Sequence, residues 1–185
     1  VVSTLVKQAN FQRPFGLTLS TNGRFLYVQT DGNDLGVRNS TTGTLWRVTL
    51  STGAVNVVAR NLGRPRGLQA LPDGRIAMSD LVQNTVSLFN PTTLDMTLLA
   101  GQAGQAGFVN AIGSSARFSR PYGLALDSDG SLLLADQNNH AIRRITLTGV
   151  VSTVAGLGAS QAGRTDGVQS AATFRAPEDV AVSNG

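Results

Sequence analysis

The amino-acid sequence predicts an all-β fold made of repeated four-stranded antiparallel units. Glycine supplies 21 of 185 residues, well above the usual ~7%. No long window places apolar residues at the 3.6-residue spacing of a helix. A short motif of Pro, a variable residue, Gly and an apolar residue also recurs along the chain. Together these observations favour strands joined by tight turns over helices.

The recurring motif sets the frame of the repeat. Its prolines are Pro14, Pro65, Pro121 and, in a looser copy, Pro177, so the units follow one another every 51 to 56 residues. Units of about 50 residues that contain four strands are typical of β-propeller blades.

Each of the first three units opens with two predicted strands. The short alternating run after the proline ends at a turn pair, which is Asn22-Gly23, Asp73-Gly74 or Asp129-Gly130. Such pairs supply the positive φ angles of a two-residue hairpin. We therefore expect the first and second strands of every unit to form an antiparallel hairpin.

After the hairpin turn, each unit continues with its second strand, a polar corner, a third strand, a turn and a fourth strand. The corner is longest in the first unit, at 31–43, and shorter in the others, at 80–84 and 136–140. The remaining predicted strand segments are 45–50 and 54–59 in the first unit, 76–79, 85–89 and 96–100 in the second, and 132–135, 141–147 and 150–155 in the third.

The two ends of the chain repeat parts of a unit. Residues 1–7 are similar to the fourth strand of the third unit, so we expect them to form the outer strand of a preceding or closing blade. Residues 177–184 are similar to a first strand, and we expect an inner strand of the next blade. The prediction is a single partial propeller domain over 1–185, with blades at 13–60, 64–101 and 120–156. Three blades cannot close a ring, so the rest of the propeller is expected in a longer chain or from another chain.

The third unit carries the most distinctive residue pattern, in the segments 118–127, Ala135-Asp136, 139–143 and 151–156. In these segments it resembles the NHL-repeat family of β-propellers, which is named for Asn-His-Leu. It is specific across residues 100 to 180. The second unit departs from the pattern, because it has Asn84-Thr85 where Asn-His would stand. The resemblance implies four-stranded antiparallel blades, a ring that is typically six-bladed, and a recognition face formed by loops around a central channel.

The residue between the repeated Pro and Gly changes from unit to unit. A fixed frame that holds a varied side chain at the mouth of a channel is what a recognition surface requires. The sequence therefore predicts a ligand-binding face at one end of the channel. The alternative is that these side chains pack on the neighbouring blade. The four residues are Phe15, Arg66, Tyr122 and Glu178.

The polar corners carry a second set of repeated residues. Asp80 and Asp136 occupy the same place in successive units, and Asp31 is a candidate counterpart. A ring of carboxylates could bind a cation, but Asp at a strand end more often accepts hydrogen bonds from the N–H groups of its own turn. We therefore interpret Asp80 and Asp136 as structural, together with Asn139 and His140. We predict no catalytic residue and no metal ligand in this chain.

Composition narrows the function classes. The chain has no cysteine and one histidine, which excludes disulfides, thiolate chemistry and a site with two or more histidine ligands. No apolar run approaches the ~18 residues of a membrane span. The leading hypothesis is a non-catalytic module that binds a protein or peptide partner, without a cofactor.

Two alternatives stay open at this point. The first is a propeller hydrolase or lyase with a metal ion in the central channel of a longer protein, as the resemblance allows. The second is RNA binding by an arginine-bearing face, for which Arg13, Arg64 and Arg120 precede equivalent prolines. More often, such arginines pair with an Asp or a carbonyl of an adjoining blade.

Overall fold

The computed structural model describes residues 4–6, 11 and 13–183, which fold into three four-stranded antiparallel sheets in the order β1-β2-β3-β4, β5-β6-β7-β8 and β9-β10-β11-β12. We call these sheets blades 1, 2 and 3. The all-β propeller prediction is confirmed. The strands are β1 Pro14–Leu19, β2 Phe25–Thr30, β3 Thr44–Thr49, β4 Val55–Ala59, β5 Pro65–Ala70, β6 Ile76–Asp80, β7 Thr85–Phe89, β8 Met96–Gly101, β9 Pro121–Leu126, β10 Leu132–Asp136, β11 Ala141–Ile145 and β12 Val151–Ala155.

Helical structure among the described residues is confined to three single 3₁₀ turns, at η1 Gly113–Ser115, η2 Gln137–Asn139 and η3 Gln169–Ala171. None of the helices in this part of the chain has the length and apolar character that crossing a bilayer would demand.

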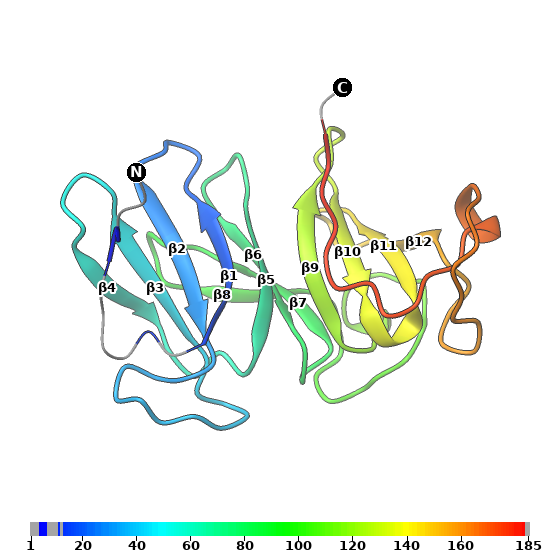
Figure 1. The fold of residues 1–185 in the computed structure, drawn as a ribbon, viewed down its shortest axis with the longest axis horizontal. Coiled ribbons are helices and arrows are strands. Elements are labelled where there is room, and N and C mark those ends of the chain that lie inside the picture. The colour runs from blue at the N-terminus through cyan, green and yellow to red at the C-terminus, as the bar shows by residue number, and fades with distance from the viewer. Residues whose placement is uncertain (1–3, 7–10, 12, 184–185) are drawn as a thin grey trace.

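The three blades stand side by side, and their first strands β1, β5 and β9 lie next to one another (Figure 1). Each sheet then continues outward through its second, third and fourth strands. The C-terminal segment, drawn in red, runs beside β9 (Figure 1). The inner strands and this segment therefore surround one shared space.

The hairpins turn differently from the prediction. In each turn only the glycine has a positive φ, 66° at Gly23, 86° at Gly74 and 81° at Gly130. The preceding Asn or Asp instead accepts a hydrogen bond from the N–H two residues later, as Asn22 Oδ1 does from Arg24 at 3.0 Å. The loops are therefore longer than two residues, and the polar residue is selected as an Asx cap.

Two apolar clusters join the blades. Tyr27 and Leu45 of blade 1 pack against Leu68 and Phe89 of blade 2. A larger cluster between blades 2 and 3 contains Val86, Leu88, Phe118, Leu132 and Leu134, among others. The core therefore consists of layers between sheets, as expected when sheets pack face to face.

The terminal strands of the sequence prediction are not present in the described residues. Residues 177–183 carry no strand, although the Gly123 N–H donates to the Glu178 carbonyl at 2.9 Å. A strand is stabilised by a ladder, and no described segment pairs with 177–183 as its hairpin partner. Of the predicted outer strand 1–7, residues 1–3 and 7 lie outside the described part, and residues 4–6 are not in a strand.

Candidate functional site

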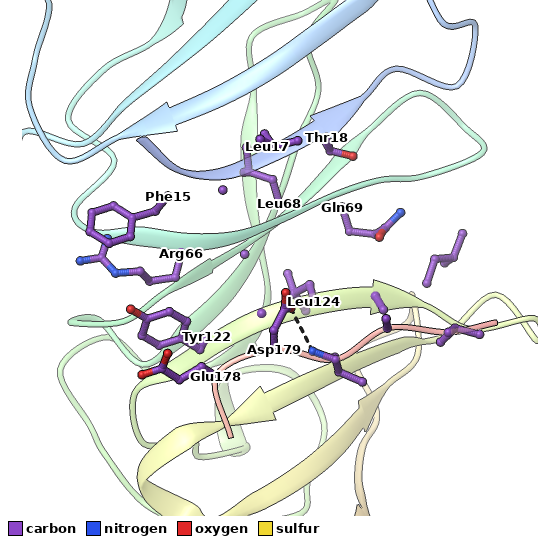
Figure 2. Close-up of a pocket in the computed structure, with 18 residues that line it drawn as sticks. Phe15, Leu17, Thr18, Arg66, Leu68, Gln69, Tyr122, Leu124, Glu178 and Asp179 are labelled. Carbon is purple, nitrogen blue, oxygen red and sulfur yellow. Dashed lines mark hydrogen bonds between the residues drawn. The ribbon is translucent and has the colours of Figure 1, made fainter. Parts of the chain in front are cut away.

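A groove of about 840 Å³ lies between the inner strands β1, β5 and β9 and residues 178–182. We call it the central groove. Its lining includes the four side chains that the sequence singled out, Phe15, Arg66, Tyr122 and Glu178. They follow one another along one end of the groove, as Figure 2 shows. The structure thus brings these four residues together.

The Arg66 guanidinium lies between two aromatic rings. Its central carbon is 3.9 Å from the centroid of the Phe15 ring and 5.9 Å from that of Tyr122. Arg66 Nη1 also donates to Asp31 Oδ1 at 2.7 Å and to the Pro65 carbonyl at 2.9 Å. Both members of the ion pair are buried. The stack and the ion pair together hold the side chain in one position.

Glu178 lies at the other side of Tyr122 and is exposed. Its Oε1 accepts a hydrogen bond from Gln137 Nε2 at 3.1 Å, and Gln137 Oε1 accepts one from Arg120 Nε at 3.1 Å. Gln137 therefore links the corner of blade 3 to the groove. Phe15 is also 44% exposed. A ligand in the groove would therefore meet the Phe15 ring and the Glu178 carboxylate more than the buried guanidinium of Arg66.

The glycine of each motif allows the inner strands to approach closely. A Cβ at Gly16 would lie 2.5 Å from the Arg66 carbonyl oxygen, and a Cβ at Gly67 would lie 2.5 Å from that of Tyr122. These glycines therefore face the backbone of the next blade.

The two repeated corner carboxylates are half-buried or buried and bind backbone N–H groups. Asp80 accepts from the N–H of Arg64 (3.2 Å), Val82 (2.8 Å) and Gln83 (2.9 Å). Asp136 accepts from the Ser119 N–H at 2.7 Å and from Asn139 Nδ2 at 2.8 Å. Burial raises the pKa of both carboxyl groups, against the lowering effect of these hydrogen bonds.

The third proposed corner residue has a different place. Pro65 pairs with Asp80 and Pro121 with Asp136, whereas Pro14 pairs with Thr30. The register counterpart of the two aspartates in blade 1 is therefore Thr30. Asp31, one residue later, instead binds Arg66, and Arg38 Nη2 at 3.3 Å. The suggestion that Asp31 is the counterpart was wrong, because the pairing of β1 with β2 places Thr30 in that register and Asp31 one residue beyond it.

His140 has a left-handed backbone (φ 51°), and its Nδ1 accepts the Ala176 N–H at 3.0 Å. Asn84 has φ 58°, and its Oδ1 accepts the Arg120 N–H at 2.9 Å. Both groups bind the residue that precedes the next proline. Asn84 therefore stands in the place of His140, and the sequence alignment of Asn84-Thr85 with Asn-His was one residue out of register.

Sequence reasoning missed one residue of the corner of blade 3. The Arg143 side chain is fully buried, and its Nη1 donates to Asp136 Oδ2 at 2.7 Å. Its Nη2 donates to the Val109 carbonyl at 3.2 Å and to Asn110 Oδ1 at 2.7 Å. Burial lowers the pKa of Arg143, while Asp136 opposes that shift. In the sequence Arg143 is only half of the longest basic run, and nothing there shows that it is buried.

The arginines before the prolines have separate roles. Arg120 binds the Gln137 amide, as described above, and the Nε of Arg64 is buried. The Arg120 partner belongs to the same blade and is not one of the Asp or carbonyl groups of an adjoining blade that were expected. For metal binding, the described ranges hold no group of three or more His, Cys, Asp or Glu side chains that could act as ligands.

The three blades around a shared central groove define the class of this protein as a β-propeller. Residues 118–145 match the family model of the NHL repeat. Over 86 residues, 46% of this chain, the sequence is 37% identical to the protein SUPPRESSOR OF QUENCHING 1, chloroplastic, of Arabidopsis thaliana. Over 163 residues, 76% of this chain, it is 25% identical to NHL repeat-containing protein 2 of Bos taurus.

The chain spans 8% and 22% of the length of these two relatives. Among solved structures, it is similar to a protein of unknown function from Bacteroides thetaiotaomicron, with a TM-score of 0.77 and 23% identity over 97% of this chain and 45% of that one. An auxiliary nutrient binding protein from the same organism gives a TM-score of 0.69 and 18% identity over 92% and 54%. Residues 118–145 therefore carry an NHL repeat, and the chain as a whole is similar to NHL-repeat β-propeller proteins.

Proposed function

We propose that this chain is part of a non-catalytic binding module whose central groove takes an extended segment of a protein or peptide partner. The observation that carries the proposal is the row of side chains at one end of the groove. Phe15, Arg66, Tyr122 and Glu178 come from four successive repeats, yet they lie in one continuous row (Figure 2). Aromatic and Arg side chains are those that most often dominate binding energy.

The row is preorganised. Arg66 is fixed by Asp31 on its charged end and by the Phe15 ring on its flat face. A side chain that is already ordered loses little entropy when a partner binds. Because Asp31 neutralises the Arg66 charge, the groove favours apolar or basic residues of a partner next to Phe15, Tyr122 and Glu178.

The inner strands also offer a backbone edge. Within their sheets, β5 pairs only with β6, and β9 pairs only with β10. One edge of each strand therefore faces the groove without a ladder, and an extended peptide can bind such an edge through its main chain. The fold itself does not choose between binding and catalysis, because similar structures include an auxiliary nutrient binding protein and a luciferin-regenerating enzyme. No contact among the described residues specifically favours the hydrolase, lyase or RNA alternatives.

The proposal is tested with a displayed library of random peptides selected on the immobilised protein. Enriched peptides should bind Tyr122→Ala and Phe15→Ala variants at least about tenfold more weakly than the wild type. Asp73→Ala, at the opposite end of the inner strand, is the matched control and should bind as the wild type does. Enriched peptides whose affinity falls only in the Asp73 variant, or no enriched peptide at all, would refute the proposal.

A further inference from the structure

A second cavity, separate from the central groove, lies beside the corner of blade 2. Its volume is about 540 Å³, and its lining includes Asp80, Thr85, Ser87, Arg60 and Met96. We call it the Asp80 cavity. The cavity is explained by comparing two positions across the three blades: the corner residue and the third-strand residue that faces it.

Strand pairing fixes the equivalent positions. In blade 3, Leu134 pairs with Arg143, and in blade 2, Met78 pairs with Ser87. Leu134 and Met78 occupy the same register, because they pair with Leu124 and Leu68 of the repeated motif. Ser87 therefore stands where blade 3 has Arg143. The same comparison in blade 1, through Val28, places Trp46 there.

In blades 1 and 3 this position holds a large side chain that binds the corner residue. Trp46 Nε1 donates to Thr30 Oγ1 at 2.8 Å, and Arg143 Nη1 donates to Asp136 Oδ2 at 2.7 Å. An aromatic ring covers each of them. Phe11 stacks on Trp46 with a centroid distance of 5.1 Å, and the Arg143 guanidinium carbon lies 4.5 Å from the centroid of Phe108.

In blade 2 the short Ser87 side chain leaves this space open, and the Asp80 cavity occupies it. Asp80 accepts three backbone N–H bonds, from Arg64, Val82 and Gln83. A carboxylate has about four acceptor sites, so one remains for a further donor. Among the described residues no side chain forms an ion pair with Asp80. Arg60 lines the cavity but donates to Asp34 through Nε at 3.0 Å and Nη2 at 2.6 Å.

We propose that the Asp80 cavity binds an alkylguanidinium group, such as the arginine side chain of a partner polypeptide, with its cation on the Asp80 carboxylate in the manner of Arg143 on Asp136. The stem of that side chain lies in the space above Ser87, beside Thr85 and Met96. This chemistry matches the lining, because burial of a carboxylate is favourable only when an opposite charge and hydrogen bonds accompany it. The site is independent of the central groove.

The test is an NMR titration of the isotope-labelled protein with acetyl-Gly-Arg-Gly-amide. The amides of Arg64, Val82 and Gln83 are the reporters, since they donate to Asp80. We expect these signals to shift with a dissociation constant on the order of 1 to 10 mM. The matching peptide with citrulline in place of arginine, which is neutral and nearly isosteric, should bind at least about tenfold more weakly.

Two variants and a second probe complete the experiment. Ser87→Arg fills the cavity from within and should abolish the titration, while Thr97→Arg, which adds the same side chain on the exposed part of β8, should leave it unchanged. N-ethylguanidinium distinguishes the sources. Equal affinity would indicate a small organic cation, and tighter binding of the peptide would indicate a polypeptide. Reporter signals that stay unmoved, respond equally to the citrulline peptide, or titrate normally in Ser87→Arg would overturn the proposal.

Discussion

The glycine of the repeated motif allows a quantitative test of how the blades pack. A Cβ at Gly67 would lie 2.5 Å from the Tyr122 carbonyl oxygen and 2.9 Å from the Leu124 N, both of which belong to the backbone of β9. Real Cβ contacts essentially never fall below 3.0 Å, so β5 and β9 must separate by about 0.5 Å or more. Because β9 is paired to β10 and packed in the core, this movement disturbs the interface between blades 2 and 3.

We expect Gly67→Ala to destabilise the protein by about 1.3 kcal/mol. Overpacking of this kind costs ~1 to 3 kcal/mol, and the lower conformational entropy of the unfolded chain offsets ~0.4 to 1 kcal/mol of that cost. Gly67→Val should reach the upper end of the range. At ~2 to 4 °C per kcal/mol for a chain of this size, the thermal midpoint of Gly67→Ala falls by roughly 3 to 5 °C.

Gly123→Ala is the matched comparison. Its Cβ would meet Asp179, which belongs to the segment 177–183 that carries no strand. This segment can move without breaking a ladder, so the loss should be about half that of Gly67→Ala or less. Urea unfolding followed by circular dichroism measures both values. Unchanged stability in Gly67→Ala, or a larger loss in Gly123→Ala, would refute the packing argument.

Three further predictions concern the corners. Arg143→Met should lower the free energy of unfolding by ~3 to 5 kcal/mol, because it leaves Asp136 buried without its partner. Arg144→Met, on the same strand, breaks half-exposed ion pairs and should lower it by less than about 1 kcal/mol in the same urea assay. His140→Ala should cost about 1 kcal/mol and His140→Asn much less, because Asn84 makes the equivalent bond; equal losses in both would contradict this. Burial raises the pKa of Asp80, so its contribution to stability is present below the ordinary Asp pKa and is lost as pH rises through the raised value. The stability of the wild type relative to Asp80→Asn should therefore increase from about pH 7 to about pH 4, and a difference that is flat with pH would exclude a raised pKa.

Much of the fold could be predicted because its determinants are local. Pro65, Gly67 and the pair Asp73-Gly74 recur in register, and each restricts the backbone where it stands. Residues 177–183 carry no strand, because a strand depends on a partner that local sequence does not describe. The turn type of the hairpins was also not predictable. Asn-Gly and Asp-Gly pairs are compatible with a two-residue turn, but equally with the observed turn, which has an Asx cap and one positive φ.

The site was predictable only in part. The position of Phe15, Arg66, Tyr122 and Glu178 followed from their register in the repeat. The stacking of Arg66 on Phe15 and its ion pair with Asp31 did not follow, because these residues lie 51 and 35 positions away in the chain. The sequence shows that blade 2 has Ser87 where blade 3 has Arg143. The two positions can be recognised as equivalent only when strand pairing shows that both face a corner carboxylate.

The central claim is that a partner binds along the inner strands, at the end that bears Tyr122. Hydrogen–deuterium exchange, measured with and without an enriched peptide, tests it most directly. Backbone amides that gain a hydrogen-bond partner, or that become shielded from solvent, exchange their hydrogens more slowly. The account predicts added protection in β1, β5 and β9 and in the segment 177–183, with little change in the hairpin turns at 20–24, 71–75 and 127–131. Protection confined to those turns or to the outer strands β4, β8 and β12 would contradict it.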